Sequence, residues 1–128
     1  MQYIIHPHHR SKGYEAQKSQ WTIPPQDEEA CFNISLKNNW LHNESCWGLH
    51  IVNNKADLIG YSPLPAKDPL KIAKFVVDQQ NNWHGYPVAP WKNPYDKPDQ
   101  TILMNWLDSG YISKSSMAKI HRGKKCDL

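Results

Sequence analysis

Long apolar runs are missing from this sequence. No stretch approaches the roughly 18 apolar residues that a membrane-spanning helix needs, and the short apolar start of the chain is broken by His6 and Pro7. Neither a membrane helix nor a secretory signal peptide is therefore expected. We predict a soluble, cytoplasmic protein without a membrane partner, and leave its oligomeric state open.

Cysteine is scarce as well. The chain has 3 cysteines, Cys31, Cys46 and Cys126, and none of them forms a CxxC pair. An odd number of cysteines without such spacing argues against a disulfide framework and favours reduced thiols. A bridge between Cys31 and Cys46 stays open, because we expect these two residues on neighbouring strands.

The signature motifs of several enzyme classes are also absent. The sequence has no glycine-rich phosphate loop, no GxSxG, no dinucleotide fingerprint and no carboxylates paired at a useful spacing. The acidic residues are scattered, apart from the cluster Asp27-Glu28-Glu29. We therefore predict no cofactor and do not expect catalysis by two carboxylates.

Two groups of residues have the composition of a metal site. They are His6, His8 and His9 near the N-terminus, and His42, Cys46 and His50 at intervals of four. On a helix the second group would share one face and suit zinc. On a strand, which we expect there, residues four apart lie about 13 Å from each other. We therefore predict no metal site.

Aromatic residues and a basic C-terminal end are what the sequence does contain. Hydrophobic residues make up 39% of the chain, but 6 Trp and 6 Tyr compensate, because each large ring can bury about 150–250 Å². A length of 128 residues fits one domain, 1–128. The net charge is +3, which is compatible with a nucleic-acid partner without requiring one.

The first half of the chain is expected to form the sheet. Residues 1–30 contain several Pro and Gly residues that interrupt regular elements, so we expect an irregular or extended segment there. Apolar and polar residues then alternate over 31–36, and 46–52 and 56–61 also have strand-like patterns. The Asn-Asn pair after 52 suits a tight turn. The sequence predicts a small antiparallel sheet over about 31–61.

Three helices are expected after the sheet, which gives an α+β fold. Asp68-Pro69 is a good start for a helix over 69–80. Asp99 is expected to cap a helix over 100–109, and Ser113 to open a last one over 114–122, with glycines at their ends. Residues 83–98 hold four prolines and four Trp or Tyr rings. This composition predicts an ordered aromatic loop.

The last two predicted helices form a helix–turn–helix-like hairpin. A recognition helix needs short polar and basic groups for base edges and phosphates. The residues that would supply them are Ser113, Lys114, Ser116, Lys119, Arg122, Lys124 and Lys125. The stretch resembles the end of the recognition helix in the lambda-repressor-like family, with matching letters at Gly110, Ser113, Ser115, Ile120, Arg122, Gly123, Lys124 and Lys125. The resemblance implies DNA binding; the alternative is two amphipathic helices that cover a sheet.

The segment around His84 and Tyr86 is the candidate catalytic site. A His beside Gly85 and between large rings could act as a general base or a proton donor. Gly85 would let a phosphate approach closely, and His50 or His121 could complete a metal-free ribonuclease site. The alternative is that the rings anchor the segment to the core while His84 hydrogen-bonds a carbonyl.

Three classes of function follow from these features. The first is a binding or regulatory protein that contacts nucleic acid through the basic C-terminal hairpin. The second is a small nuclease or toxin-like enzyme that uses His84 and Tyr86. The third is a protein-interaction partner of the immunity or inhibitor type, which would use an exposed aromatic patch at Trp91 and Tyr95.

Overall fold

The centre of the structure, a computed structural model that describes residues 1–126 and 128, is a mixed β-sheet. The described residues form six strands in the order β1 (Gln2–Tyr3), β9 (Asn82–Val88), β8 (Ile72–Val77), β4 (Ser45–Val52) and β3 (Leu41–His42), with β5 (Lys55–Asp57) also paired to β4. Neighbours are antiparallel except β1 and β9, which are parallel. A small second sheet contains β2 (Gln20–Trp21), β6 (Gly60–Tyr61) and β7 (Pro69–Leu70).

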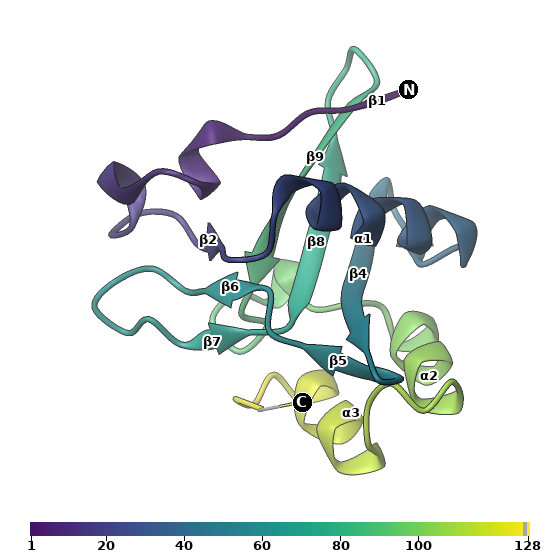
Figure 1. Cartoon of the computed structure of the whole chain (residues 1–128). Coiled ribbons are helices and arrows are strands. Elements are labelled where there is room, and N and C mark those ends of the chain that lie inside the picture. The colour runs from purple at the N-terminus through teal and green to yellow at the C-terminus, as the bar shows by residue number, and fades with distance from the viewer. Residues whose placement is uncertain (127) are drawn as a thin grey trace.

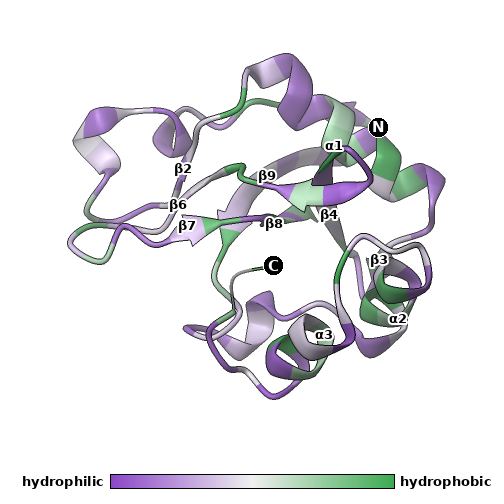
Figure 2. Ribbon diagram, turned by 60° about the horizontal axis from the view of Figure 1, so that its bottom comes forward, coloured by the Kyte–Doolittle hydropathy of each residue, from purple (hydrophilic) through white to green (hydrophobic). Residues whose placement is uncertain are grey.

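Helices cover both faces of the central sheet. In Figure 1, α1 (Pro25–Lys37) lies across β4, β8 and β9. Figure 2 shows the sheet between α1 on one side and the pair α2 (Gln100–Asp108) and α3 (Lys114–His121) on the other. Each face has its own apolar core: Phe32 and Phe75 lie in the one beneath α1, and Trp40 and Trp106 in the one beneath α2 and α3. The protein is therefore a three-layer α+β structure.

The predicted strand over 31–36 is wrong, because these residues belong to α1. The buried positions of this helix are Glu28, Cys31, Phe32 and Ser35, which is the i, i+3, i+4, i+7 spacing of a helical face. Pro25 at the first helical position and acidic residues in the first turn favour the start of a helix. Over a segment as short as 31–36, the apolar and polar residues seemed to alternate, although the buried positions have helical spacing.

The predicted helix over 69–80 is also wrong. The segment forms β7 and then β8, whose residues Ile72–Phe75 are all buried. A strand that is covered on both faces has a nearly continuous apolar run instead of an alternating one. In β8 this run is interrupted by the buried Lys74, whose Nζ donates to Tyr95 O at 2.6 Å. Alternate residues enter opposite cores, Ile72 on the α2–α3 side and Phe75 on the α1 side. The short apolar run was compatible with either element, and burial on both faces selected the strand.

The predicted loop over 83–98 is half right. Residues 82–88 form β9, which pairs with β8 from Trp83 to Val88. Residues 89–98 are a loop that contains one short 3-10 turn, η3 (Pro94–Asp96). Because β9 is a strand, the sheet is larger than expected and extends well beyond 31–61, and β1 adds a parallel strand to it.

Several local signals were read correctly. The strand predicted over 46–52 is β4, and Asn53 and Asn54 make the turn after it with positive φ angles of 52° and 64°. The predicted return strand over 56–61 is split into β5 and β6. Asp99 caps α2 by accepting from Thr101 N, and Ser113 caps α3 by accepting from Ser116 N.

The N-terminal segment was expected to be irregular or extended over 1–30, but residues 25–30 belong to a helix. Between β1 and β2 it makes two 3-10 turns, η1 (Pro7–His9) and η2 (Lys12–Tyr14), and α1 starts at Pro25. The three cysteines are free thiols. No helix among the described residues is long and apolar enough to cross a membrane.

Candidate active site

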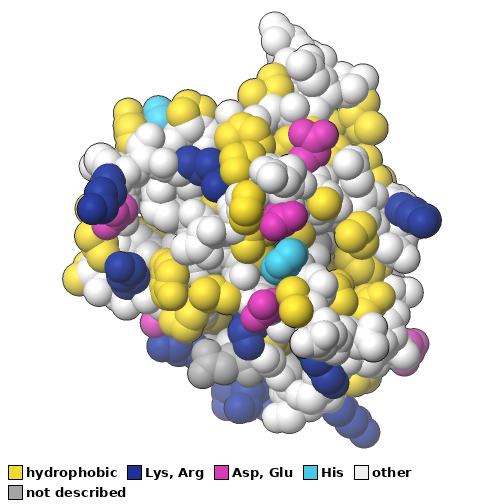
Figure 3. All heavy atoms as spheres, in the orientation of Figure 1, with side chains coloured by type: hydrophobic (Ala, Val, Ile, Leu, Met, Phe, Trp, Pro, Cys, Tyr) yellow, Lys and Arg dark blue, Asp and Glu magenta, His cyan; other side chains and the backbone are white. Residues whose placement is uncertain are grey.

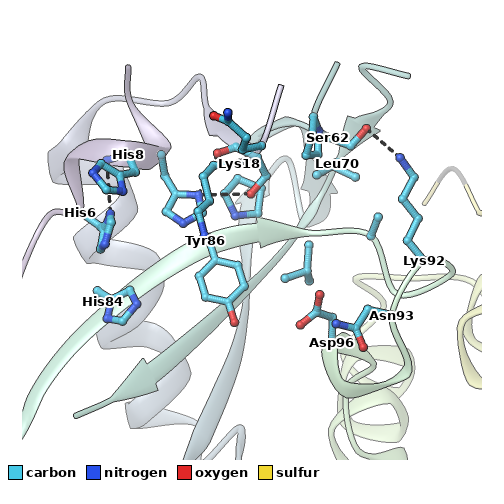
Figure 4. Close-up of a pocket in the computed structure, with 17 residues that line it drawn as sticks. His6, His8, Lys18, Ser62, Leu70, His84, Tyr86, Lys92, Asn93 and Asp96 are labelled. Carbon is cyan, nitrogen blue, oxygen red and sulfur yellow. Dashed lines mark hydrogen bonds between the residues drawn. The ribbon is translucent and has the colours of Figure 1, made fainter. Parts of the chain in front are cut away.

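A cleft of about 550 Å³ lies over β9, on the face of the sheet that α2 and α3 also cover. Figure 4 shows His84 and Tyr86 on the strand, with His6 and His8 at one end of the cleft and Lys92 at the other. The histidines come from η1 and the residue before it, and Lys92 from the loop after β9. Two regions that are distant in sequence, the N-terminal segment and β9 with the loop after it, therefore meet at one concave surface.

The strand itself places the two predicted catalytic side chains together. His84 and Tyr86 are two residues apart on β9, so both point to the same face, while Trp83 points to the core beneath α1. The centroids of the two cleft rings are 6.3 Å apart. The loop predicted from the sequence would not have fixed this arrangement, because only a strand imposes the two-residue period.

The role predicted for Gly85 is wrong. A Cβ atom on this residue would lie 2.2 Å from the Phe75 ring, on the face opposite the cleft. The glycine therefore makes room for Phe75 and does not admit a ligand. Its carbonyl accepts a hydrogen bond from Trp21 Nε1 at 3.1 Å, which pairs a backbone group at the edge of the sheet.

The histidine segment is folded against His84. His6 precedes η1 and its Nδ1 accepts from the backbone N–H of His8 at 3.2 Å. In the neutral ring the proton is therefore on Nε2. The His6 ring lies 5.2 Å from the His84 ring and 5.4 Å from the His9 ring, measured between centroids. The sequence showed the three N-terminal histidines but not that His84 is their neighbour.

A buried carboxylate holds both ends of this segment. The Tyr3 hydroxyl donates to Glu28 Oε2, and Arg10 donates to Glu28 Oε1 from Nε at 3.1 Å and from Nη2 at 2.8 Å. The Glu28 side chain is 1% exposed. Burial raises the pKa of this carboxyl, and the hydrogen bonds from Tyr3 and Arg10 oppose that rise. Tyr3 and Arg10 flank residues 6–9, so Glu28 on α1 fixes the position of the histidines.

His9 is the deepest histidine of the cleft. It is buried and stacked on Tyr86, with ring centroids 5.2 Å apart and an angle of 15° between the rings. Its Nδ1 lies 2.8 Å from the Ser19 carbonyl oxygen. A carbonyl only accepts, so Nδ1 carries the proton and Nε2 the lone pair. Burial lowers the pKa of His9 to about 4, and the ring is neutral at pH 7.

His84 and Tyr86 have complementary protonation states at neutral pH. Burial lowers the pKa of His84 below its usual 6.5, and Asp78 opposes this shift. Burial also raises the pKa of Tyr86 to about 12. At pH 7 the imidazole is therefore neutral and can accept a proton, while the phenol keeps its proton and can donate it.

Cationic side chains flank this pair. Lys18 and Lys92 line the cleft, and Lys92 Nζ lies 3.3 Å from Asp68 Oδ2. The carboxylate that lines the cleft, Asp96, is 3.6 Å from Lys74 Nζ. Burial raises the pKa of Asp96, and Lys74 opposes the rise. The arrangement can receive an anionic group between the histidine end and Lys92.

The other predicted site residues lie outside this cleft. His50 on β4 and His121 at the end of α3 do not line it. Ser113 and Ser116 form the cap of α3, and Ser116 is buried. The basic residues of the C-terminal hairpin are exposed: Lys114, Lys119, Arg122, Lys124 and Lys125. The hairpin packs on the sheet through Ile102, Leu103, Trp106, Ile112 and Ile120.

Asp68 links the end of the basic segment to the cleft, because it pairs with Lys125 and with the cleft residue Lys92. Lys125 Nζ is 2.8 Å from Asp68 Oδ1, and Lys92 pairs with the other oxygen of the same group. The predicted partner-binding residues, Trp91 and Tyr95, lie on the loop between β9 and α2. Tyr95 is 82% exposed, and Trp91 is half-buried and lines a separate cavity of about 240 Å³.

No set of three or more His, Cys, Asp or Glu side chains within residues 1–126 and 128 is arranged to hold a metal ion. No protein-family model, curated protein or solved structure matches the chain.

Proposed function

We propose that this protein is a ribonuclease that works by acid–base catalysis, with His84 as general base and Tyr86 as general acid. The observation that supports this proposal is the pairing of the two side chains. They lie at i and i+2 on one face of β9, in a cleft, with a neutral imidazole next to a protonated phenol. RNA is the substrate class that this pair suits, because its 2′-hydroxyl is an internal nucleophile.

In the proposed reaction, His84 accepts the proton of the 2′-hydroxyl, and O2′ forms a bond with the adjacent phosphorus. The bond between phosphorus and O5′ breaks, and the Tyr86 hydroxyl gives its proton to O5′. The O5′ alkoxide is a stronger base than the Tyr86 phenolate, because the pKa of the Tyr86 phenol is about 12. Proton transfer from Tyr86 to O5′ is therefore favourable. The products are a 2′,3′-cyclic phosphate and a 5′-hydroxyl, and the proton on His84 returns the phenolate to phenol through solvent.

The remaining groups of the cleft bind the phosphate. The His6 Nε2–H is available as a donor, because Nδ1 already accepts from His8 N. Lys18 and Lys92 line the cleft and supply positive charge. Hydrogen bonds between ionised partners are the stronger class, so the pentavalent phosphate, with its added charge, gains more from these donors than the ground state does.

The test is cleavage of a fluorescein-labelled single-stranded RNA in the presence of EDTA. We expect His84→Ala to lower kcat/KM by about 10²–10⁴-fold, the range for loss of one acid–base group. Tyr86→Phe should lower it by a similar factor while keeping the ring that stacks on His9. The DNA oligonucleotide of the same sequence should remain intact, because it lacks the 2′-hydroxyl.

His121→Ala is the matched control, since this histidine is exposed on α3 and does not line the cleft. It should retain wild-type activity when purified in the same way. The proposal is wrong if the wild-type protein cleaves no RNA, or if His84→Ala cleaves as fast as the control. A product other than a 2′,3′-cyclic phosphate would refute the assigned chemistry.

A second candidate is non-catalytic binding of nucleic acid by the C-terminal hairpin. Exposure of Lys114, Lys119, Arg122 and Lys124 favours it. A salt titration of binding to double-stranded DNA distinguishes it from the first proposal. Binding that weakens with salt, with a shallower dependence in the double variant Lys124→Ala/Lys125→Ala and no cleavage of RNA, would support the hairpin as the functional surface.

A further inference from the structure

A second cavity of about 410 Å³ lies between the N-terminal segment and the loop that joins β6 to β7. Three cationic residues, Arg10, Lys12 and Lys67, and one carboxylate, Glu15, line it together with Trp21, Tyr61 and Ser62. Lys and Arg side chains gather over η2 and the β6–β7 loop in Figure 3. Ser62 is the residue that this cavity shares with the cleft over β9.

The cavity combines aromatic rings with positive charge. Lys67 Nζ lies 5.6 Å from the centroid of the Tyr61 ring, and the Arg10 guanidinium lies 5.9 Å from that of Trp21. Arg10 is already paired with Glu28. Lys12 and Lys67, in contrast, have no carboxylate oxygen within 4.0 Å among the described residues. These two ammonium groups are available to an anionic ligand.

The backbone holds Lys67 in a position that a lysine rarely adopts. Its φ is +47°, in the left-handed region that favours Gly or Asn and costs other residues about 1 kcal/mol or more. The surrounding loop is closed by Ser62 N donating to Asp68 O at 2.9 Å and by Asp68 N donating to Ser62 Oγ at 2.8 Å. The chain thus carries a long cationic side chain where glycine would be less strained.

The two cavities adjoin at the same serine. Lys92 Nζ, at the far end of the cleft from His6, donates to Ser62 Oγ at 3.4 Å. Ser62 lines both spaces, and Tyr61 and Lys67 line the second, so an oligonucleotide longer than the cleft has a second cavity beside it. Positive charge together with an aromatic ring is the combination that binds single-stranded nucleic acid, by phosphate contacts and base stacking.

We propose that this second cavity is a subsite for a flanking nucleotide of single-stranded RNA. Tyr61 contacts the base, and Lys67 and Lys12 bind the phosphate. This inference rests on the ribonuclease function proposed above for its substrate class, but it concerns binding and does not require cleavage.

The test measures binding of fluorescein-labelled 2′-O-methyl oligouridines, which lack the nucleophile and cannot be cleaved at their methylated positions. Fluorescence anisotropy gives the Kd for a dimer and a hexamer. We expect the hexamer to bind the wild-type protein more tightly than the dimer. Lys67→Gly and Tyr61→Leu should each weaken hexamer binding by about 5–50-fold, the range expected for loss of one phosphate or stacking contact, and should leave dimer binding unchanged.

Lys67→Gly is the decisive variant, because glycine accepts the positive φ and should not destabilise the fold. Lys37→Ala is the control, because this exposed lysine at the end of α1 does not line the cavity. It removes the same charge and should leave hexamer affinity unchanged. Equal hexamer affinity for wild type and Lys67→Gly would overturn the subsite, and so would no binding of either oligonucleotide. Hexamer binding that depends on Lys67 in a protein that cleaves no RNA would support the subsite and refute the ribonuclease.

Discussion

Replacement of Glu28 by Gln tests how the histidine segment is held. The change removes the charge that pairs with Arg10 and replaces one acceptor oxygen by an NH2 group. Loss of one partner from a buried ion pair typically costs about 3–5 kcal/mol. The Arg10 side chain is 20% exposed and water can partly solvate it, so we expect Glu28→Gln to lower the free energy of unfolding by about 2–3 kcal/mol.

Urea unfolding followed by tryptophan fluorescence measures this change. With an m value of about 2 kcal/mol/M, the midpoint should fall by roughly 1–1.5 M. Glu29→Gln is the control, because Glu29 is the exposed neighbour on the same helix and its loss should change stability by no more than about 0.5 kcal/mol. A midpoint for Glu28→Gln equal to that of the control would refute the role assigned to this carboxylate.

Three further predictions concern the cleft and the strand beneath it. The kcat/KM for RNA should rise with pH through an apparent pKa below 6.5, because burial lowers the pKa of His84; a midpoint above 7 would contradict this assignment. The free energy of unfolding should fall by at most about 3 kcal/mol as the pH falls from about 6.5 towards 4. The reason is that His9, with its pKa of about 4 in the folded state, stays neutral there while the unfolded state binds a proton. The urea midpoint of His9→Gln should depend less on pH over this range. Gly85→Ala should destabilise the protein by about 1–3 kcal/mol, since the new methyl group would overlap the Phe75 ring, and an unchanged urea midpoint would show that the ring can move aside.

The C-terminal third was read best because its signals are local. Asp99 and Ser113 cap helices with hydrogen bonds to backbone N–H groups two or three residues later, and Gly110 has the positive φ of a helix end. The turn at Asn53 and Asn54 is equally local. These features depend on a few neighbouring residues and are visible in the sequence before any packing is known.

The elements of the central layers depended on what covers them. Apart from Lys74, Ile72–Val77 is apolar and suits either a helix or a strand, and contact with both helical layers made it a strand. Cys31–Leu36 alternates over a few residues and yet is helical, because α1 needs one buried face only. Short windows do not contain this information, since burial on one face or two is a property of the assembled layers.

The sequence by itself determined the α+β class and the two C-terminal helices with their caps, and the proposal of His84 and Tyr86 as catalytic residues also starts from it. Only the tertiary structure decided that these two side chains share a face of β9 and that His6 lies beside His84. It also placed Glu28 where Tyr3 and Arg10 both reach it, across 25 and 18 positions of sequence. Such contacts arise because burial of apolar surface brings distant segments together, and no local pattern records which segments will meet.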